Sequence, residues 1–532
     1  MHNFPLLLLY PEIHYHIGWL YPLYYRRVPE IIADLPIRIE IQKNPSIPIL
    51  IIVKDAHRFP VTLNKIYVSV ASKQLNMQKT VDLNHHIEKR YFSQIISLPF
   101  PQIDFSQPAD ITVTFYITRK QDGKNFIFQN DNLPGIHTRL RTFLSIEPLP
   151  GEPHWYAGET HYHSFFTEDQ VEFGADIDSA VHLAKRMGLQ WLLVTDHSYD
   201  LDDSEENFLT NDPLLPKWQK IKRHVKTIQK MEKFPMICGE EVSCGNKKNK
   251  NIHLLVINNE QFIEGKGDSA EHWFHNAPTL SLAEVMTKIE QDAIVIGAHT
   301  ADDHQDPIST ILLKRGVWSE EDITNANIIY IQILNEDTPR KIDSAKKSWV
   351  SLLLKGYKAL ALAGNDAHGY FNLTRKIGIP FLNLAKSQKQ IFGNLKTFIK
   401  ADTPLTGENF VDEFKKNRII ISNGPFARFM INEYEIGSTI YARENNELKV
   451  EIYACSSEEF GLLKSIKLIS GKTEDQNEMV EKEWQIMHYK FSQTSHLHWK
   501  EQNYFRIEAL TDKKKFCLTN PIWVCTFYKV NN

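Results

Sequence analysis

Six clusters of metal-ligating residue types lie between residues 161 and 368, each just after an apolar run, and they constrain the fold more than any other feature. In chain order they contain His161 and His163; Asp196 and His197; Glu241; His253; His299; and Asp366 and His368. Strands that end at one face of a barrel gather such residues into a site for several metal ions. The pattern therefore predicts a multinuclear metallohydrolase.

Length and composition indicate a globular protein of several domains. At 532 residues the chain is too long for one ordinary core, and about two to four domains are expected. The fractions of hydrophobic residues (42%) and charged residues (24%) are those of a globular protein. The net charge of -4 provides no general basic surface for nucleic acid. The lysine-rich run at residues 247–250 is interpreted as a solvated loop.

No segment predicts export or membrane insertion. The N-terminal apolar run is broken by Pro5 and Pro11, and no stretch approaches the roughly 18 apolar residues of a membrane span. The five cysteines are scattered and include no CxxC pair, which indicates reduced thiols. We therefore expect a cytoplasmic protein with a small-molecule substrate and with neither nucleic acid nor membrane as a partner. The oligomeric state is left open.

Hydrophobic periodicity divides the chain into three parts. Alternation at Ile66, Val68 and Val70 predicts antiparallel strands and an N-terminal β-sandwich-like domain at residues 1–150, which the Pro- and Gly-rich stretch at 147–153 ends. Alternation returns after residue 417 and predicts a second all-β sandwich-like domain at residues 417–532.

Residues 155–416 instead alternate between helix and strand patterns. An apolar face from Ile177 to Met187 predicts a helix that Gly188 ends, and Ser281 and Glu284 have capping-box spacing. Repeated helix–strand units imply a parallel sheet with its ligands at the strand ends. A closed or distorted barrel is favoured over an open sheet, because the first and last strands both contribute ligands.

The spacing of the ligands indicates their chemistry. Two histidines separated by one residue on a strand point to the same face and can chelate one ion, and Asp366 and His368 repeat this spacing. A glutamate such as Glu241 can bridge two ions. Ions held in this way generate a bridging hydroxide near neutral pH, which suits phosphoester hydrolysis best and carbamate, ester or amide hydrolysis nearly as well.

In this order the motifs resemble the PHP (polymerase and histidinol phosphatase) domain family. The matching residues are His161-Tyr162-His163, Thr195-Asp196-His197, residues 239–243 with His253, the isolated His299, and Asp366-Ala367-His368. The resemblance spans roughly half the chain and implies a distorted (β/α)7 barrel with two or three divalent ions of Zn, Mn or Fe. The runs GETHYHS, TDHSYDL, SNGP and NPIW resemble the CehA/McbA-type group, which includes a carbamate hydrolase.

The resemblance also implies roles for particular residues. It selects Glu241 over Glu240, and it places a further ligand after the HxH pair, where Glu168 is favoured over Asp169. The implied metal ligands are His161, His163, Glu168, His197, Glu241, His253, His299, Asp366 and His368. Glu241 and Asp366 are the implied catalytic residues, and Asp366 or a metal-bound water would transfer the proton. Arg375 would clamp a substrate oxyanion or form a structural salt bridge.

Other interpretations stay open. The amidohydrolase superfamily also begins with HxH, although the closing DxH argues against it, and a non-catalytic binding module is the third possibility. Asp196 is expected to orient a neighbouring imidazole. Asp302, Asp303 and His304 are expected to be loop or supporting residues. The second HYH tripeptide, at residues 14–16, lacks the strand–helix context and is not expected to bind metal.

Overall fold

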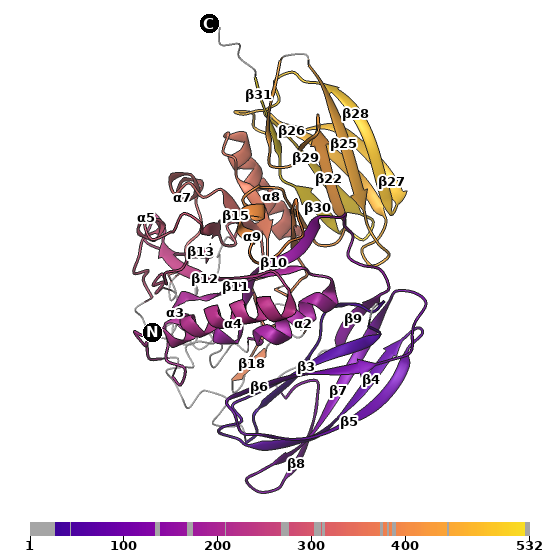
Figure 1. The fold of residues 1–532 in the computed structure, drawn as a ribbon, viewed down its shortest axis with the longest axis vertical. Helices are drawn as coiled ribbons and strands as arrows, with labels where there is room; N and C mark the ends of the chain where they lie inside the picture. The colour runs from indigo at the N-terminus through magenta and orange to yellow at the C-terminus, as the bar shows by residue number, and fades with distance from the viewer. Residues whose placement is uncertain are drawn as a thin grey trace.

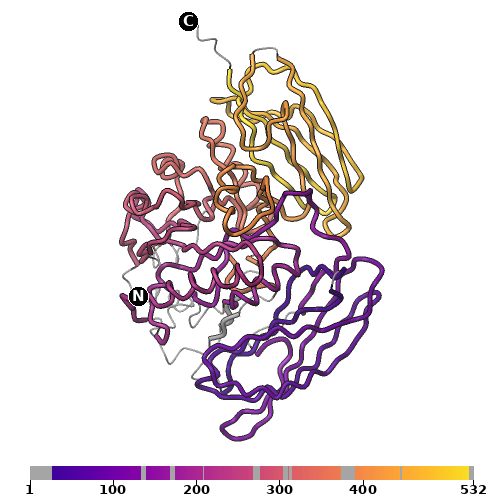
Figure 2. The backbone as a smooth tube through the Cα atoms, viewed as in Figure 1, coloured from indigo at the N-terminus to yellow at the C-terminus, as the bar shows by residue number. Residues whose placement is uncertain are grey.

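The computed structural model describes residues 27–42, 44–132, 139–167, 174–207, 209–267, 276–302, 310, 314–372, 376–379, 382–385, 390–443 and 446–526. Of these, 45% are in strands and 15% in helices. Figures 1 and 2 show the N-terminal sheets and the C-terminal strands at opposite ends of the molecule, with the central segment between them. Within the described residues no helix is long and apolar enough to cross a membrane.

The N-terminal part contains a three-stranded and a six-stranded sheet. The first has the order β1 (Glu30–Asp34), β3 (Ser46–Lys54) and β6 (Tyr91–Pro99). The second has the order β2 (Arg38–Glu40), β9 (Leu140–Ser145), β7 (Gln107–Arg119), β4 (Val61–Ser72) and β5 (Asn76–Ile87), with β8 (Asn125–Gln129) on β7. Strands β4 and β7 are antiparallel and bury alternate residues, as the period of two predicts.

The central part contains β10 to β16 and most of the helices. The strands are β10 (Trp155–His163), β11 (Trp191–His197), β12 (Met236–Gly245), β13 (Asn251–Ile257), β14 (Ile294–Gly297), β15 (Tyr330–Leu334) and β16 (Leu360–Ala363). The helices are η3 (Phe165–Thr167), α2 (Ile177–Met187), α3 (Ser198–Leu201), α4 (Pro216–Glu232), α5 (Leu282–Met286), α7 (Glu320–Asn325) and α8 (Pro339–Leu354). Helix α2 contacts β2, β3 and β6 and so links the central part to the N-terminal sheets.

The chain then continues into strands that join the central and C-terminal parts. These elements are β17 (Ala367–His368), β18 (Lys376–Ile379), β19 (Leu382–Ala385), β20 (Lys396–Lys400), α9 (Phe410–Phe414) and β21 (Ile419–Ser422). The C-terminal strands are β22 (Phe426–Ile431), β23 (Tyr434–Glu435), β24 (Thr439–Ala442), β25 (Glu447–Cys455), β26 (Leu463–Gly471), β27 (Met479–His488), β28 (Lys490–His498), β29 (Tyr504–Thr511), β30 (Phe516–Thr519) and β31 (Ile522–Thr526).

Two local predictions about helices are confirmed. Helix α2 begins after Asp176, whose side chain accepts a hydrogen bond from Ser179 N, and it ends at Gly188, which has a φ of 90°. Ser281 and Glu284 form the predicted capping box at the start of α5. These three helix ends depend on contacts between near neighbours in the chain, which sequence patterns describe well.

The predicted central distorted (β/α)7 barrel between two all-β sandwich-like domains is wrong. The described chain is mostly β, and strands β10 to β16 belong to one 16-stranded sheet in which β12, β13 and β14 pair antiparallel. The main order of this sheet is β16-β15-β14-β13-β12-β11-β10-β20-β21-β30-β29-β26-β27. This order has two ends, and it runs from the central segment directly into the C-terminal strands.

Side chains explain why β16 ends the sheet instead of closing a ring. Ala361 N donates to Asn520 Oδ1 (2.7 Å), and Asn520 Nδ2 donates back to Ala361 O (3.0 Å). Ala363 N donates to Thr397 Oγ1 (3.0 Å), and that hydroxyl donates to Ala363 O (2.7 Å). Because Asn520 and Thr397 satisfy these backbone groups of β16, its outer edge needs no further strand.

Candidate metal centre

The structure brings eight of the nine predicted ligands together. His161 and His163 lie on β10, His197 ends β11, Glu241 lies on β12, His253 on β13, His299 just after β14, and Asp366 and His368 at β17. Strand pairing explains the convergence, because His197 is in register with Glu241, and His163 with His368. Residues that are far apart in sequence therefore occupy adjacent positions of neighbouring strands.

These residues form three groups, each with its ligand atoms within 4.8 Å of one another. The first contains His161, His163, Glu241 and Asp366; the second contains Glu241, His253 and His299; the third contains His163, His197 and His368. Glu241 is shared by the first two groups, and His163 by the first and third. The groups therefore form one continuous cluster.

Glu241 lies at the centre of this cluster with its two oxygens facing different histidines. Oε1 is 2.8 Å from His253 Nδ1 and 3.3 Å from His299 Nε2. Oε2 is 3.2 Å from His163 Nε2, 3.4 Å from His161 Nε2 and 2.9 Å from His197 Nδ1. A carboxylate placed in this way can bridge two cations.

The HxH and DxH pairs face each other. His161 Nε2 and His163 Nε2 are 3.0 Å apart, and Asp366 Oδ1 is 3.4 Å and 3.1 Å from them. His368 Nε2 is 3.4 Å from His197 Nε2, and its ring stacks on His163 with centroids 4.1 Å apart. The two pairs were predicted to have the same geometry, but Asp366 lies before β17 and has a φ of 50°.

Hydrogen bonds outside the cluster orient two of the imidazoles. His161 Nδ1 is 2.8 Å from Gln332 Oε1, and Gln332 Nε2 donates to Gly364 O (3.0 Å). The amide oxygen must therefore be the acceptor, so His161 Nδ1 carries the proton and Nε2 presents its lone pair. His368 Nδ1 donates to Asp366 O (3.1 Å) and leaves its Nε2 in the same state.

The charges of the cluster strongly favour cations. Burial opposes ionisation of Glu241, but His253, His161 and His197 outweigh it and hold the pKa of this carboxyl well below its usual value. Burial would also lower the pKa of His163, yet the hydrogen bond with Asp366 and the nearby charge of Glu241 raise it to about 10. Buried carboxylates that stabilise positive charge on imidazoles would stabilise metal ions in the same positions.

The residues present fit divalent metal ions. Glu241 Oε2 is fully buried and has no hydrogen bond to any described residue, although three imidazole nitrogens lie within 3.4 Å. A buried acceptor oxygen without a hydrogen bond, surrounded by imidazole nitrogens, suits a position beside a metal ion. The mixed histidine and carboxylate donors suit Zn, Mn or Fe.

Not every predicted role agrees with the structure. Glu240 points away from the cluster and accepts hydrogen bonds from Ser198 Oγ (3.0 Å) and Ile263 N (3.0 Å). Asp196 was expected to orient a neighbouring imidazole, but none of its described hydrogen bonds is to a histidine. Its carboxylate accepts from Ser164 N (2.8 Å) and Thr167 Oγ1 (2.8 Å), and so holds the turn after the HxH pair.

Asp302 was expected to be a loop or supporting residue, and its contacts are those of a supporting residue. Its Oδ2 lies 3.7 Å from His299 Nδ1, and its Oδ1 accepts from Lys341 Nζ (2.5 Å). Several residues singled out in the sequence lie outside the described residues. These are Glu168, Asp169, Asp303, His304, Arg375 and the HYH copy at residues 14–16.

Sequence reasoning missed four residues that adjoin the cluster. They are Glu159, Tyr199, Gln332 and Gln390. A signal existed for two of them, because Glu159 precedes the HxH pair with the same period of two, and Gln332 interrupts an apolar strand. Tyr199 stacks on His197 with centroids 4.6 Å apart, and Gln390 donates to Asp366 Oδ2 (2.8 Å).

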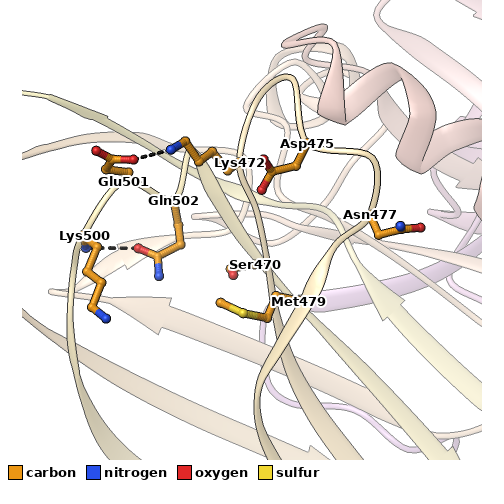
Figure 3. Close-up of a pocket in the computed structure, with 8 residues that line it drawn as sticks. All are labelled: Ser470, Lys472, Asp475, Asn477, Met479, Lys500, Glu501 and Gln502. Carbon is orange, nitrogen blue, oxygen red and sulfur yellow. Dashed lines mark hydrogen bonds and ion pairs between the residues drawn. The ribbon is translucent and has the colours of Figure 1, made fainter.

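A separate pocket of about 200 Å³ lies among the C-terminal strands (Figure 3). Its lining consists of Ser470, Lys472, Asp475, Asn477, Met479, Lys500, Glu501 and Gln502. Lys472 pairs with Glu501, and Gln502 accepts a hydrogen bond from the backbone of Lys500. None of the eight predicted ligands lines it, so it is distinct from the candidate metal centre.

Comparison with known proteins adds little. No protein-family model and no curated protein matches the chain. A β-glucuronidase of Bacteroides uniformis has a TM-score of 0.18 and 9% identity, over 93% of this chain and 61% of that chain. A β-glucuronidase of Parabacteroides merdae has a TM-score of 0.17 and 8% identity, over 94% and 66%. This chain thus spans less than two thirds of either protein, and similarity at such TM-scores supports no argument about fold or function.

Proposed function

We propose that this chain is a metal-dependent hydrolase in which the eight gathered side chains hold two or three divalent ions. One observation carries the proposal: Glu241 and His163 each belong to two of the three donor groups, so that the chain offers adjacent candidate cation sites joined by common residues. The ordered motifs that resemble the PHP family support the same interpretation. Phosphoester hydrolysis is the reaction that we favour.

Each part of the cluster has a task in the proposed reaction. Ions bound here would lower the pKa of a water molecule and neutralise charge on the attacked group. Glu241 would supply ligand oxygens to the ions, and Gln332 holds His161 in the tautomer that presents Nε2. Asp366 directs Oδ1 toward the HxH pair and would accept the proton of the attacking water.

Carbamate, ester or amide hydrolysis is the second candidate. The motifs that resemble the CehA/McbA-type group favour it, and activation of water does not depend on the bond that is cleaved. A non-catalytic binding module is the third candidate. It is disfavoured because a module without activity has no need for three connected donor groups.

The proposal can be tested with protein purified without chelator. Metal content should be about two to three ions per chain, and a screen of phosphomonoesters, phosphodiesters, carbamates and aryl esters should identify the bond class. Glu241→Gln removes the charge of the shared ligand, and we expect it to lower turnover at least about 100-fold. Glu240→Gln is the matched control, because Glu240 is the adjacent buried carboxylate and faces away from the cluster.

Three results would separate the candidates. Substantially less than one ion per chain would favour the binding module. Full turnover by Glu241→Gln would exclude the assigned centre. Hydrolysis of carbamates with no hydrolysis of phosphoesters would select the second candidate over the first.

A further inference from the structure

Glu159 is a fully buried carboxylate that joins three segments around the metal centre. It lies on β10 two residues before His161 and is 0% exposed. Its Oε1 accepts hydrogen bonds from His161 N (3.2 Å) and Asn365 N (2.9 Å). Its Oε2 accepts from Gly393 N (3.2 Å) and from the side-chain amide of Asn365.

Asn365 extends this network to the segment before β20. Its Nδ2 also donates to Leu395 O (2.8 Å), and its Oδ1 accepts from Leu395 N (2.9 Å). The side chain of Asn365 is therefore fixed by Glu159 on one side and by the backbone of Leu395 on the other. Asn365 is itself 0% exposed, so water does not compete for these bonds.

The residue that follows Asn365 is Asp366, whose backbone is in the left-handed region with a φ of 50°. This conformation is strained for a residue with a Cβ, and it persists only where the surroundings hold it. The same conformation brings Asp366 Oδ1 to within 3.1 Å of His163 Nε2. The position of this predicted ligand thus depends on how firmly residues 364–366 are held.

We infer that Glu159 is a positioning residue that acts through Asn365 to hold Asp366 against the HxH pair. The inference rests on the proposed metal-dependent function. None of the described hydrogen bonds of Glu159 goes to a side chain of the DxH pair; Glu159 instead holds the backbone and the side chain of Asn365, the residue before Asp366. The two acceptor oxygens of Glu159 suit this position, because all of its described hydrogen-bond partners are N–H donors.

The test is a double-mutant cycle that measures Mn²⁺ binding to metal-stripped protein by calorimetry. Glu159→Gln keeps the shape but turns an NH₂ group toward N–H donors, so we expect one class of Mn²⁺ site to weaken about 10–100-fold. Asp366→Asn should weaken the same class. The double variant should be no weaker than Asp366→Asn alone, because both changes remove one interaction.

The controls keep the two proposals separate. Glu240→Gln removes another buried carboxylate and should leave Mn²⁺ binding unchanged. Wild-type protein that binds no Mn²⁺ would overturn both the function and the inference. Two outcomes would overturn the inference alone. One is a wild-type affinity for Mn²⁺ in Glu159→Gln; the other is a double variant in which the losses of Mn²⁺ affinity from Glu159→Gln and Asp366→Asn add fully.

A second variant covers the case in which Glu159→Gln does not unfold cooperatively. Asn365→Ala removes the connecting amide and leaves Glu159 in place. The inference is supported if Asn365→Ala weakens Mn²⁺ binding at the same site and if adding Asp366→Asn lowers that affinity no further than Asp366→Asn does alone. Unchanged Mn²⁺ binding in a folded Asn365→Ala protein contradicts it.

Discussion

Adjacent buried residues on a strand can have opposite roles, because their side chains point to opposite faces. Glu240 and Glu241 are both fully buried on β12, yet only Glu241 faces the histidines. The histidines hold the pKa of Glu241 well below its usual value, whereas burial raises the pKa of Glu240 to about 8. The same residue type is therefore ionised on one face and largely protonated on the other at neutral pH.

Lys396 is the residue from which we expect a clear pH effect on stability. It is 4% exposed on β20, and burial lowers its pKa to about 7, although Glu459 opposes the shift. Unfolded lysine has a pKa of about 10.4, so between about pH 7 and 10 the unfolded chain binds more protons. This residue should therefore make stability rise with pH, by at most about 1.4 kcal/mol per unit.

Comparison of Lys396→Met with the wild type isolates this contribution. Urea unfolding should be measured between pH 6 and pH 10. The free energy of unfolding of the variant, relative to that of the wild type, should be greatest up to about pH 7 and should decline above it. The decline follows because only wild-type Lys396 loses its buried charge over that range. Parallel stability curves for the two proteins would contradict the assignment.

At the level of elements, the loop between β16 and β17 must approach β10 closely. A Cβ on Gly364 would lie 2.3 Å from Thr160 Oγ1 and 2.9 Å from His161 Cβ. Thr160 cannot easily move, because its hydroxyl is buried and donates to Ala363 O (2.8 Å). Glycine at this position therefore allows the DxH pair to reach the HxH pair.

Gly364→Ala should consequently disturb both stability and the proposed metal centre. We expect the free energy of unfolding to fall by about 1–3 kcal/mol, with weaker Mn²⁺ binding because His161 is displaced. Chemical denaturation of metal-stripped protein and Mn²⁺ titration would measure the two effects. Gly123→Ala is the control: its φ is 67° and no atom lies within 4 Å of the added Cβ, so only stability should change. Equal metal binding in all three proteins would refute this role of Gly364.

At the level of the whole molecule, the N-terminal sheets support the loops next to the ligands. Asp34 on β1 accepts a hydrogen bond from Phe371 N (2.9 Å), three residues after His368. Tyr91 on β6 donates to Gly174 O (3.1 Å) and stacks on Phe165, two residues after His163. The N-terminal part thus contacts the segments that follow both the HxH and the DxH pairs.

The C-terminal strands are joined to the centre still more closely. Strand β20 pairs with β10 on one side and with β21 on the other, and the buried Ile419, Ile420 and Ile421 lie on β21. Deletion of residues 417–532 would expose β20 and remove Asn520 from the edge of β16. We expect the shortened chain to lack a cooperative thermal transition and to bind no Mn²⁺, since burial of apolar surface drives folding.

Asn520→Ala is the milder companion to this deletion. It removes the hydrogen bonds to Ala361 N and O, and we expect a loss of about 1–3 kcal/mol with the metal centre retained. Calorimetric unfolding and metal content would measure both proteins. A shortened chain with wild-type metal content and a cooperative transition would show that the C-terminal strands are dispensable.

Local pattern was sufficient to predict the α2 and α5 helix ends, the alternating strand β4 and the side chains that gather in the cluster. The helix ends and the strand depend on spacing within a few residues, whereas the clustered side chains were predicted from the order of their motifs along the chain. The choice of Glu241 over Glu240 came from the resemblance of the motifs, and the structure places only Glu241 among the other ligands.

Only the tertiary structure decided how the strands are joined. Periodicity marks a strand but does not name its partner, so the antiparallel β12–β13–β14 pairing and the continuation through β20 could not be predicted. The main strand order leaves β16 at one end, where Thr397 and Asn520, distant in sequence, satisfy its backbone groups. Likewise, Glu159 and Gln332 acquire their roles only once the folded chain brings Asn365 and His161 to them.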